Sequence, residues 1–260
     1  MTSERAPIPL IVLHSRPYSD SSLIIETFSE HQGRIPVLSK GARRTGKQSL
    51  RAQLQMGVLI EACVTGRGEI KSLVRPEVVE STAGFHGESF AMASYISELL
   101  IKLTHPGDPH PSLFSKTLDC FKAISARQNT LVSMRLFEQC LLTEMGVNVD
   151  YKQDVNGHAI DASKYYRLTP LYGFENVSSD DQCLESKPSF VPLKGEALLA
   201  ISSQELSDAS VLSAVKYINR RLIDAQLGTT KLSSRELWLK WQGRFKQNHK
   251  ASLSEPRDKA

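Results

Sequence analysis

The chain has 260 residues, which is long enough for two domains or one large domain. Its hydrophobic fraction of 40% and charged fraction of 23% are typical of a globular protein and exclude wholesale disorder. No apolar run approaches the ~20 residues needed to cross a membrane, and the N-terminus lacks a basic start followed by an apolar signal core. We therefore expect a cytoplasmic protein in a reducing environment.

The charges are unevenly distributed along the chain. Between residues 34 and 75, nine basic residues stand against Glu61 and Glu69, whereas seven acidic residues outnumber three basic ones between residues 150 and 185. After Lys231 the chain is basic again. A basic first third beside a more acidic middle is typical of a nucleic-acid-binding module joined to a second part.

Residues 7–80 predict β structure. Apolar residues alternate in short runs, near residues 8–14, 23–28, 34–39, 56–65 and 69–79, and turn residues separate the runs. Five short strands with glycine-rich turns favour a small closed barrel over an open sheet, because a barrel removes the exposed edges. The five-stranded oligonucleotide-binding (OB) barrel is the expected fold.

The third of these strands runs into a cationic loop within residues 33–51, GRIPVLSKGARRTGKQSLR, which contains no acidic residue. Such side chains displace condensed counterions from a phosphate backbone and bind it without sequence preference. The predicted DNA-binding residues are Arg34, Lys40, Arg43, Arg44, Lys47 and Arg51, with Arg67 and Lys71 as neighbours.

Two alternatives remain for this loop. Gly41, Gly46 and Lys47 match the G-x-x-x-x-G-K core of a nucleotide-binding loop, which would make the chain a nucleotide hydrolase. Gln48, however, occupies the position of the hydroxyl that holds magnesium, and no second metal-holding element follows. The other alternative is a protein-interaction scaffold with an incidental solvated basic loop. No catalytic motif is found elsewhere, so we predict a protein that is not an enzyme.

From residue 87 onward the apolar period becomes helical. Helices are predicted over about 87–103, 111–126, 130–145 and 194–201, after Asp208 as N-cap, and from a capping box at Ser233–Glu236. The expected fold class is α+β: an OB barrel over 1–80, a helical domain over 81–247 in which residues 147–190 are irregular, and a disordered tail over 248–260.

Several residues within the helical part admit two interpretations. Arg135, inside an apolar helix, is either a snorkelling surface arginine or an anion-binding arginine at the rim of an apolar pocket. The loop His105–His110 could ligate a metal, although its prolines explain it as a helix breaker. The aromatic residues of Lys164–Phe174 could form short strands that stack bases, or pack this segment onto the helices.

The four cysteines form no C-x-x-C pair, so neither a zinc site nor a disulfide framework is predicted.

Five segments together resemble the RecO family of bacterial recombination mediators. They are LHSRPYSDSSLIIETFSEHQGRIPVLSKGARR, GRGEIKSL, YISELL, MRLFEQCLL and LSSRELW, in the family's order between His14 and Trp238. The most specific of them is KGAR at Lys40–Arg43, followed by Ser49 and Leu50. The resemblance covers nearly the whole chain.

The resemblance implies an OB barrel followed by a helical domain. It implies binding of single- and double-stranded DNA, annealing of complementary strands, and cooperation with RecR to load the recombinase onto DNA coated by single-strand-binding protein. It also implies a pocket for the acidic C-terminal tail of that protein, in which Arg135 would pair with the terminal carboxylate while Leu99 and Leu142 receive an apolar side chain.

Many RecO proteins carry a four-cysteine zinc module between their helices. Residues 147–190 of this chain contain only Cys183, so four ligands cannot be assembled and no zinc, nor any other cofactor, is expected. In this respect the chain resembles the zinc-less branch of enteric-type bacteria. The expected location is the cytoplasm, in association with the nucleoid.

Overall fold

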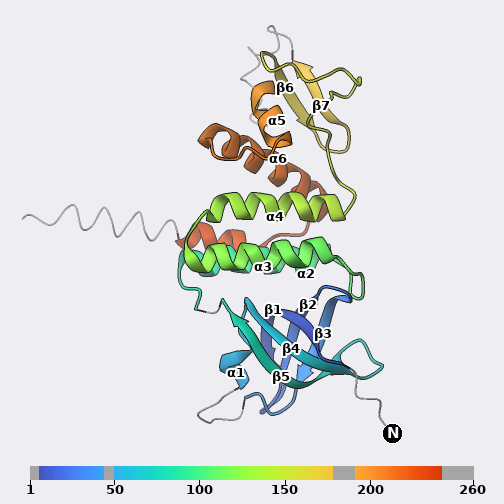
Figure 1. The fold of residues 1–260 in the computed structure, drawn as a ribbon, viewed down its shortest axis with the longest axis vertical. Helices are drawn as coiled ribbons and strands as arrows, with labels where there is room; N and C mark the ends of the chain where they lie inside the picture. Colours follow the sequence, from blue (N-terminus) through green and yellow to red (C-terminus); the bar gives the residue numbers. More distant parts are fainter. Residues whose placement is uncertain (1–5, 44–49, 83, 178–190, 242–260) are drawn as a thin grey trace, which may run out of the picture. The chain divides into compact units, whose positions relative to one another are not determined.

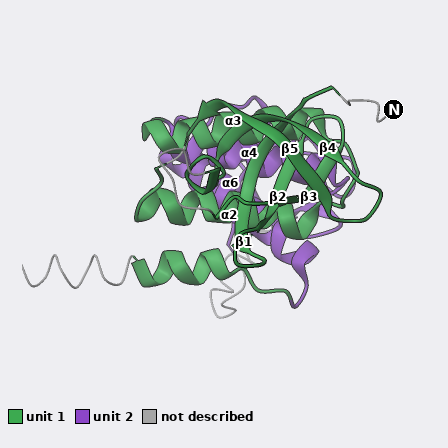
Figure 2. Ribbon diagram, turned by 90° about the horizontal axis from the view of Figure 1, so that it is seen from below, with its two compact units in different colours: residues 1–128, 230–260 green, residues 129–229 purple. Residues whose placement is uncertain are grey.

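The computed structural model describes residues 6–43, 50–82, 84–177 and 191–241. The chain forms two compact units, one of residues 1–128 with 230–260 and the other of residues 129–229 (Figure 2). Within the described ranges, no helix combines the length and the apolarity needed to cross a membrane.

The first unit begins with a closed barrel of five strands (Figure 1). They are β1 (Ile8–Pro17), β2 (Leu23–Ser29), β3 (Gly33–Ser39), β4 (Val58–Thr65) and β5 (Lys71–Ser81), in the order β1-β2-β3-β5-β4. All pairs are antiparallel except β3 with β5, which is parallel. The predicted OB-type barrel is therefore confirmed.

The barrel encloses an apolar core built by alternation along the strands. Its buried members are Leu10, Val12, Leu23, Ile25, Ile35, Val37, Ala42, Leu54, Val58, Ile60, Ala62, Val64 and Leu73. Residues on the other face of β1 and β2, such as Ile11 and Phe28, are also fully buried. The ring of Phe28 lies 6.3 Å from that of Phe114 in α3, so this face of the barrel packs on the helices of the same unit. Burial on both faces explains why β1 is apolar at consecutive positions.

Three helices of the first unit are α1 (Leu50–Gln53), α2 (Glu88–Leu103) and α3 (Pro111–Ala126). The spans of α2 and α3 match the predicted helices, whereas the single turn α1 has no counterpart among the predicted elements. The loop after α2 lies against the start of β3: a Cβ on Gly33 would stand 1.9 Å from the Asp108 carbonyl oxygen, and Gly33 has φ of +60°. Only glycine fits there without displacing backbone.

The second unit contains α4 (Thr130–Glu144), α5 (Gly195–Ser202) and α6 (Ala209–Leu227), with a small sheet in the order β7-β6-β8. Its strands are β6 (Tyr165–Thr169), β7 (Gly173–Val177) and β8 (Leu193–Lys194). Residues 147–190 were expected to be irregular, but they contain the β6-β7 hairpin. Short strands at Lys164–Phe174 had been one of the two interpretations of the sequence. Asp208 caps α6 as predicted, and its hydrogen bonds from Ser210 and Val211 hold its pKa below the ordinary value.

A last helical segment over residues 233–241 belongs to the first unit. Its first amides do not rely on the predicted capping box. The Ser233 and Ser234 N–H groups donate to the Glu98 carboxylate of α2 at 2.9 and 2.8 Å, and the Lys102 ammonium lies 2.9 Å from the same carboxylate. The guanidinium of Arg235 lies 5.8 Å from the centre of the Tyr95 ring. Side chains of α2 therefore cap and hold the helix in place of a local serine.

We predict that the contact between Glu98 and the last helix is lost in acid. Burial alone would raise the pKa of Glu98, but hydrogen bonds from Ser234, Lys102 and Ser233 outweigh it and hold the pKa below the ordinary value of a glutamate. The contact therefore stabilises the helix while Glu98 is ionised, and it is lost as the pH falls through the lowered pKa. Both tryptophans of the chain, Trp238 and Trp241, lie in this helix, so their emission should shift to the red as the pH falls through that pKa.

Glu98→Gln should remove this acid transition. At neutral pH it should lower the free energy of unfolding, measured by tryptophan emission, by about 1 kcal/mol. The matched control is Glu88→Gln, in the exposed first turn of the same helix. An identical acid transition in Glu98→Gln would contradict the assignment.

Candidate nucleic-acid interface

The basic loop follows the end of β3, a strand whose residues alternate between buried and partly buried positions. Val37 is buried in the barrel core, and Lys40, just beyond the strand, is exposed. Arg44 and Lys47 lie outside the described residues. The structure therefore bears on the two ends of the loop.

Backbone contacts bring the two ends of the loop together. Ala42 is fully buried, and its carbonyl accepts from the Arg51 N–H at 3.1 Å. The Arg43 N–H donates to the Ser21 carbonyl at 3.0 Å, and its guanidinium donates to the Ser19 carbonyl at 2.6 Å. Residues on either side of the loop are thus anchored to each other and to the turn between β1 and β2.

Pairing of β3 with β5 adds a further cation at this end of the barrel. Lys71 lies opposite Val37 and Ser72 opposite Leu38 in parallel register. Lys40 is three residues past Val37, which is about 10 Å along the strand. Lys40, Arg51 and Lys71 form no ion pair with another described residue, so their charge is available to an anion. Arg67 is also exposed, in the turn that precedes Lys71.

Arg34 stands apart from the other predicted residues. It lies at the start of β3, about 20 Å along the strand from Lys40. Its guanidinium donates to the Glu26 carboxylate of β2 at 3.0 Å, and the two side chains are only 16% and 20% exposed. A contact of Arg34 with DNA remains a prediction, and this ion pair would have to be shared or broken to make it.

The nucleotide-loop alternative stays untested by the structure. A phosphate-binding loop delivers the phosphates to the N-terminus of a helix that begins at its Gly-Lys pair. Gly46 and Lys47 lie outside the described residues, and the description resumes with α1 at Leu50.

The residues predicted for the tail pocket are divided between the two units. Leu99 belongs to α2 in the first unit and is fully buried there. Arg135 and Leu142 belong to α4 in the second unit, where they are 8% and 2% exposed. The pocket that would unite the three residues remains a prediction.

Arg135 belongs to a buried polar cluster in the second unit. Its guanidinium donates to the Glu138 carboxylate at 2.8 Å, and the Asn219 amide of α6 donates to that carboxylate at 3.0 Å. Asn219 also donates to the Arg135 carbonyl at 3.2 Å. The spacing of three residues between Arg135 and Glu138 could have been read from the sequence as a helical ion pair, whereas Asn219, 84 residues away, could not.

A five-stranded barrel with a cationic loop, followed by helices, defines a class of OB-barrel proteins with an added helical region. Residues 7–82 match the family described as Recombination protein O N terminal, and residues 85–236 match Recombination protein O C terminal. The chain belongs to the RecO family.

Individual relatives agree over most of their length. A DNA repair protein RecO of Pseudomonas entomophila (strain L48) is 33% identical over 90% of this chain and 98% of its own. Those of Aliivibrio fischeri (strain MJ11) and Ralstonia nicotianae (strain ATCC BAA-1114 / GMI1000) are each 32% identical, over 88% and 90% of this chain and 93% and 84% of their own.

Arg34→Met and Arg51→Met remove one cation each and should have different effects. Arg34→Met leaves Glu26 without its partner and should lower the free energy of unfolding by about 1–3 kcal/mol. Arg51→Met should leave stability unchanged and reduce the slope of log affinity against log salt by about 0.7 for single strands. Urea unfolding and salt titrations of oligonucleotide binding measure the two effects, and a reduced slope in Arg34→Met would show that Arg34 contacts phosphate.

Arg135→Ala should lower the free energy of unfolding by about 3–5 kcal/mol, because it leaves the buried Glu138 carboxylate without a counter-charge. The double variant Arg135→Met with Glu138→Gln removes both charges and keeps an acceptor for Asn219, so it should recover more than half of that loss in urea unfolding. If Arg135→Ala is as stable as the wild type, the cluster does not depend on this ion pair.

Proposed function

We propose that this chain, a member of the RecO family, acts in recombination repair by binding DNA through the barrel. The proposed substrates are single- and double-stranded DNA, held by their phosphates. The proposed activity is annealing of complementary strands and, with RecR, loading of the recombinase onto DNA coated by single-strand-binding protein. We propose this role without a catalytic step, in the cytoplasm at the nucleoid.

One observation carries the proposal: the base of the cationic loop is fixed at the end of β3. The Ala42–Arg51 hydrogen bond and the anchoring of Arg43 hold the loop base there, and Lys71 lies opposite Val37 of the same strand. Exposed cations on a fixed base suit a continuous phosphate backbone, because each one can displace a condensed counterion. Neutralising two strands lowers their mutual repulsion, and contacts limited to phosphates leave the base edges free to pair. Annealing follows from these two effects.

We also propose that the second unit binds the acidic tail of single-strand-binding protein near Arg135. The buried Glu138 sets a condition on this proposal, because an incoming carboxylate would have to share the Arg135 guanidinium with it. Two of the guanidinium nitrogens can serve two carboxylates, since the group presents five N–H donors.

The experiment that tests the DNA site is a salt titration of full-length protein with fluorescent oligo-dT. Log affinity should fall linearly with log salt, and the double variant Arg43→Glu with Arg44→Glu should weaken binding and reduce the slope by at least about 1.4. The control is Arg220→Glu with Arg221→Glu, two adjacent exposed arginines of α6 in the second unit.

Three outcomes would favour an assignment other than the proposed DNA site. An unchanged slope in the loop variant would place the phosphate contacts elsewhere. Nucleotide hydrolysis that disappears in Lys47→Ala would favour the hydrolase. Absent or salt-insensitive DNA binding, with the tail peptide still bound, would favour the interaction scaffold.

A further inference from the structure

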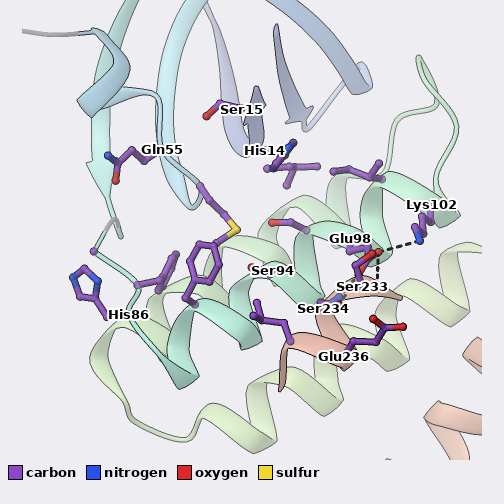
Figure 3. Close-up of a pocket in the computed structure, with 18 of the residues that line it drawn as sticks. His14, Ser15, Gln55, His86, Ser94, Glu98, Lys102, Ser233, Ser234 and Glu236 are labelled. Carbon is purple, nitrogen blue, oxygen red and sulfur yellow. Dashed lines mark hydrogen bonds and ion pairs between the residues drawn. The ribbon is translucent and has the colours of Figure 1, made fainter. Parts of the chain in front are cut away.

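The first unit contains a groove that the proposed phosphate contacts do not use, apart from Arg51 (Figure 3). It is formed by β1, the connection from α1 to β4, the helix α2 and the last helix over residues 233–241. Its volume is about 950 Å³. Sites for small organic ligands occupy roughly 300–1,000 Å³, so the groove can hold a group the size of a nucleotide.

Part of the groove is apolar and uncovered. Phe90 of α2 is 45% exposed and Leu237 of the last helix is 39% exposed, and both line the groove together with the buried Phe85. Neighbouring residues of α2, such as Ala91 and Ala93, are buried as an amphipathic helix requires. An exposed phenylalanine inside a groove leaves a ring face open to a flat ligand.

The groove also contains polar groups. Ser97 is 4% exposed, and its hydroxyl oxygen has no hydrogen-bond partner among the described residues. Ser94, Gln55 and His14 are further polar residues of the lining (Figure 3). A wholly apolar occupant would leave the Ser97 hydroxyl unsatisfied, and a buried polar group without a partner is costly. The ligand therefore needs polar atoms at an edge as well as an apolar face.

The charges of the groove disfavour a strongly charged occupant. Glu98 and Lys102 lie 2.9 Å apart and hold the start of the last helix, so both are already engaged. Glu236 and Lys240 add one charge of each sign from that helix. A neutral group with flat apolar faces and hydrogen-bonding edges fits this lining, and a nucleobase has these properties.

Arg51 connects the groove to the proposed phosphate surface. It lines the groove, and its backbone N–H is bonded to Ala42 at the base of the cationic loop. A strand whose phosphate lies on Arg51 has a base within reach of the groove. We propose that the groove receives an unstacked base of single-stranded DNA, with Phe90 as the stacking side chain and Ser97 as a hydrogen-bonding partner. The inference rests on the proposed DNA binding and adds a base-contacting site to it.

The test compares oligo-dT with an abasic oligonucleotide of equal length, both bound to the full-length protein at fixed salt. Oligo-dT should bind more tightly, and Phe90→Ala should weaken its binding by about 5- to 150-fold while the abasic oligonucleotide and the salt slope are unaffected. Ser97→Ala should weaken oligo-dT in the same selective way, by a smaller factor. The matched control is Leu131→Ala, an apolar residue of α4 in the second unit that is 55% exposed.

Phe90→Leu keeps apolar volume and removes the ring, so the loss of stacking can be measured even where Phe90→Ala does not fold. Equal affinity for the two oligonucleotides, unchanged in Phe90→Leu, would overturn the base site and leave the phosphate site standing. Absence of binding to either oligonucleotide at low salt would overturn both. Phe90-dependent binding of an acidic peptide that oligo-dT does not displace would assign the groove to a protein partner instead.

Discussion

The short parallel pairing of β3 with β5 is the constraint on which the barrel and its proposed interface depend. It joins Val37 to Lys71 and Leu38 to Ser72, and closes a sheet in which the other neighbours are antiparallel. Without it, the ends of the sheet would expose unpaired strand edges, and the apolar faces that meet inside the barrel would be wetted. The same pairing places Lys71 beside β3, the strand that leads to the cationic loop. It therefore both closes the barrel and adds a positive charge near that loop.

The arginines of this chain show why residue type alone does not define a binding site. Arg34 and Arg135 each donate to a carboxylate in a place with little access to water, whereas Arg51 is exposed and forms no ion pair with a described residue. Removing a buried arginine leaves an uncompensated carboxylate, while removing an exposed one mainly changes the charge offered to an anion. The partner and its burial therefore decide whether an arginine stabilises the fold or is available to DNA, and only the folded structure supplies both.

Much of the fold follows from periodicity in the sequence, and the remainder depends on contacts between distant segments. The strands of the barrel and the spans of α2, α3 and α6 match the predicted ranges because alternation and 3.6-residue spacing are local signals. The capping of the last helix was predicted from its own serines, but Glu98, 135 residues earlier, accepts their amide protons. The single turn α1 is too short to show a period. For the proposed site, the sequence identifies the basic residues, but it does not show that the Glu26 carboxylate forms an ion pair with Arg34.

The return of the last helix to the first unit links the stability of the fold to the proposed base site. In the sequence, residues 129–229 separate α3 from this helix and form a unit of their own. The chain then returns to α2, where Glu98 and Lys102 bind residues 231–234. Leu237 and Lys240, which line one side of the groove, follow directly within that helix. The contact of Glu98 with the helix N-terminus therefore helps to position one side of the groove. A charged residue of α2 thus contributes both to the attachment of the chain's last described helix and to the shape of the surface proposed to receive a base.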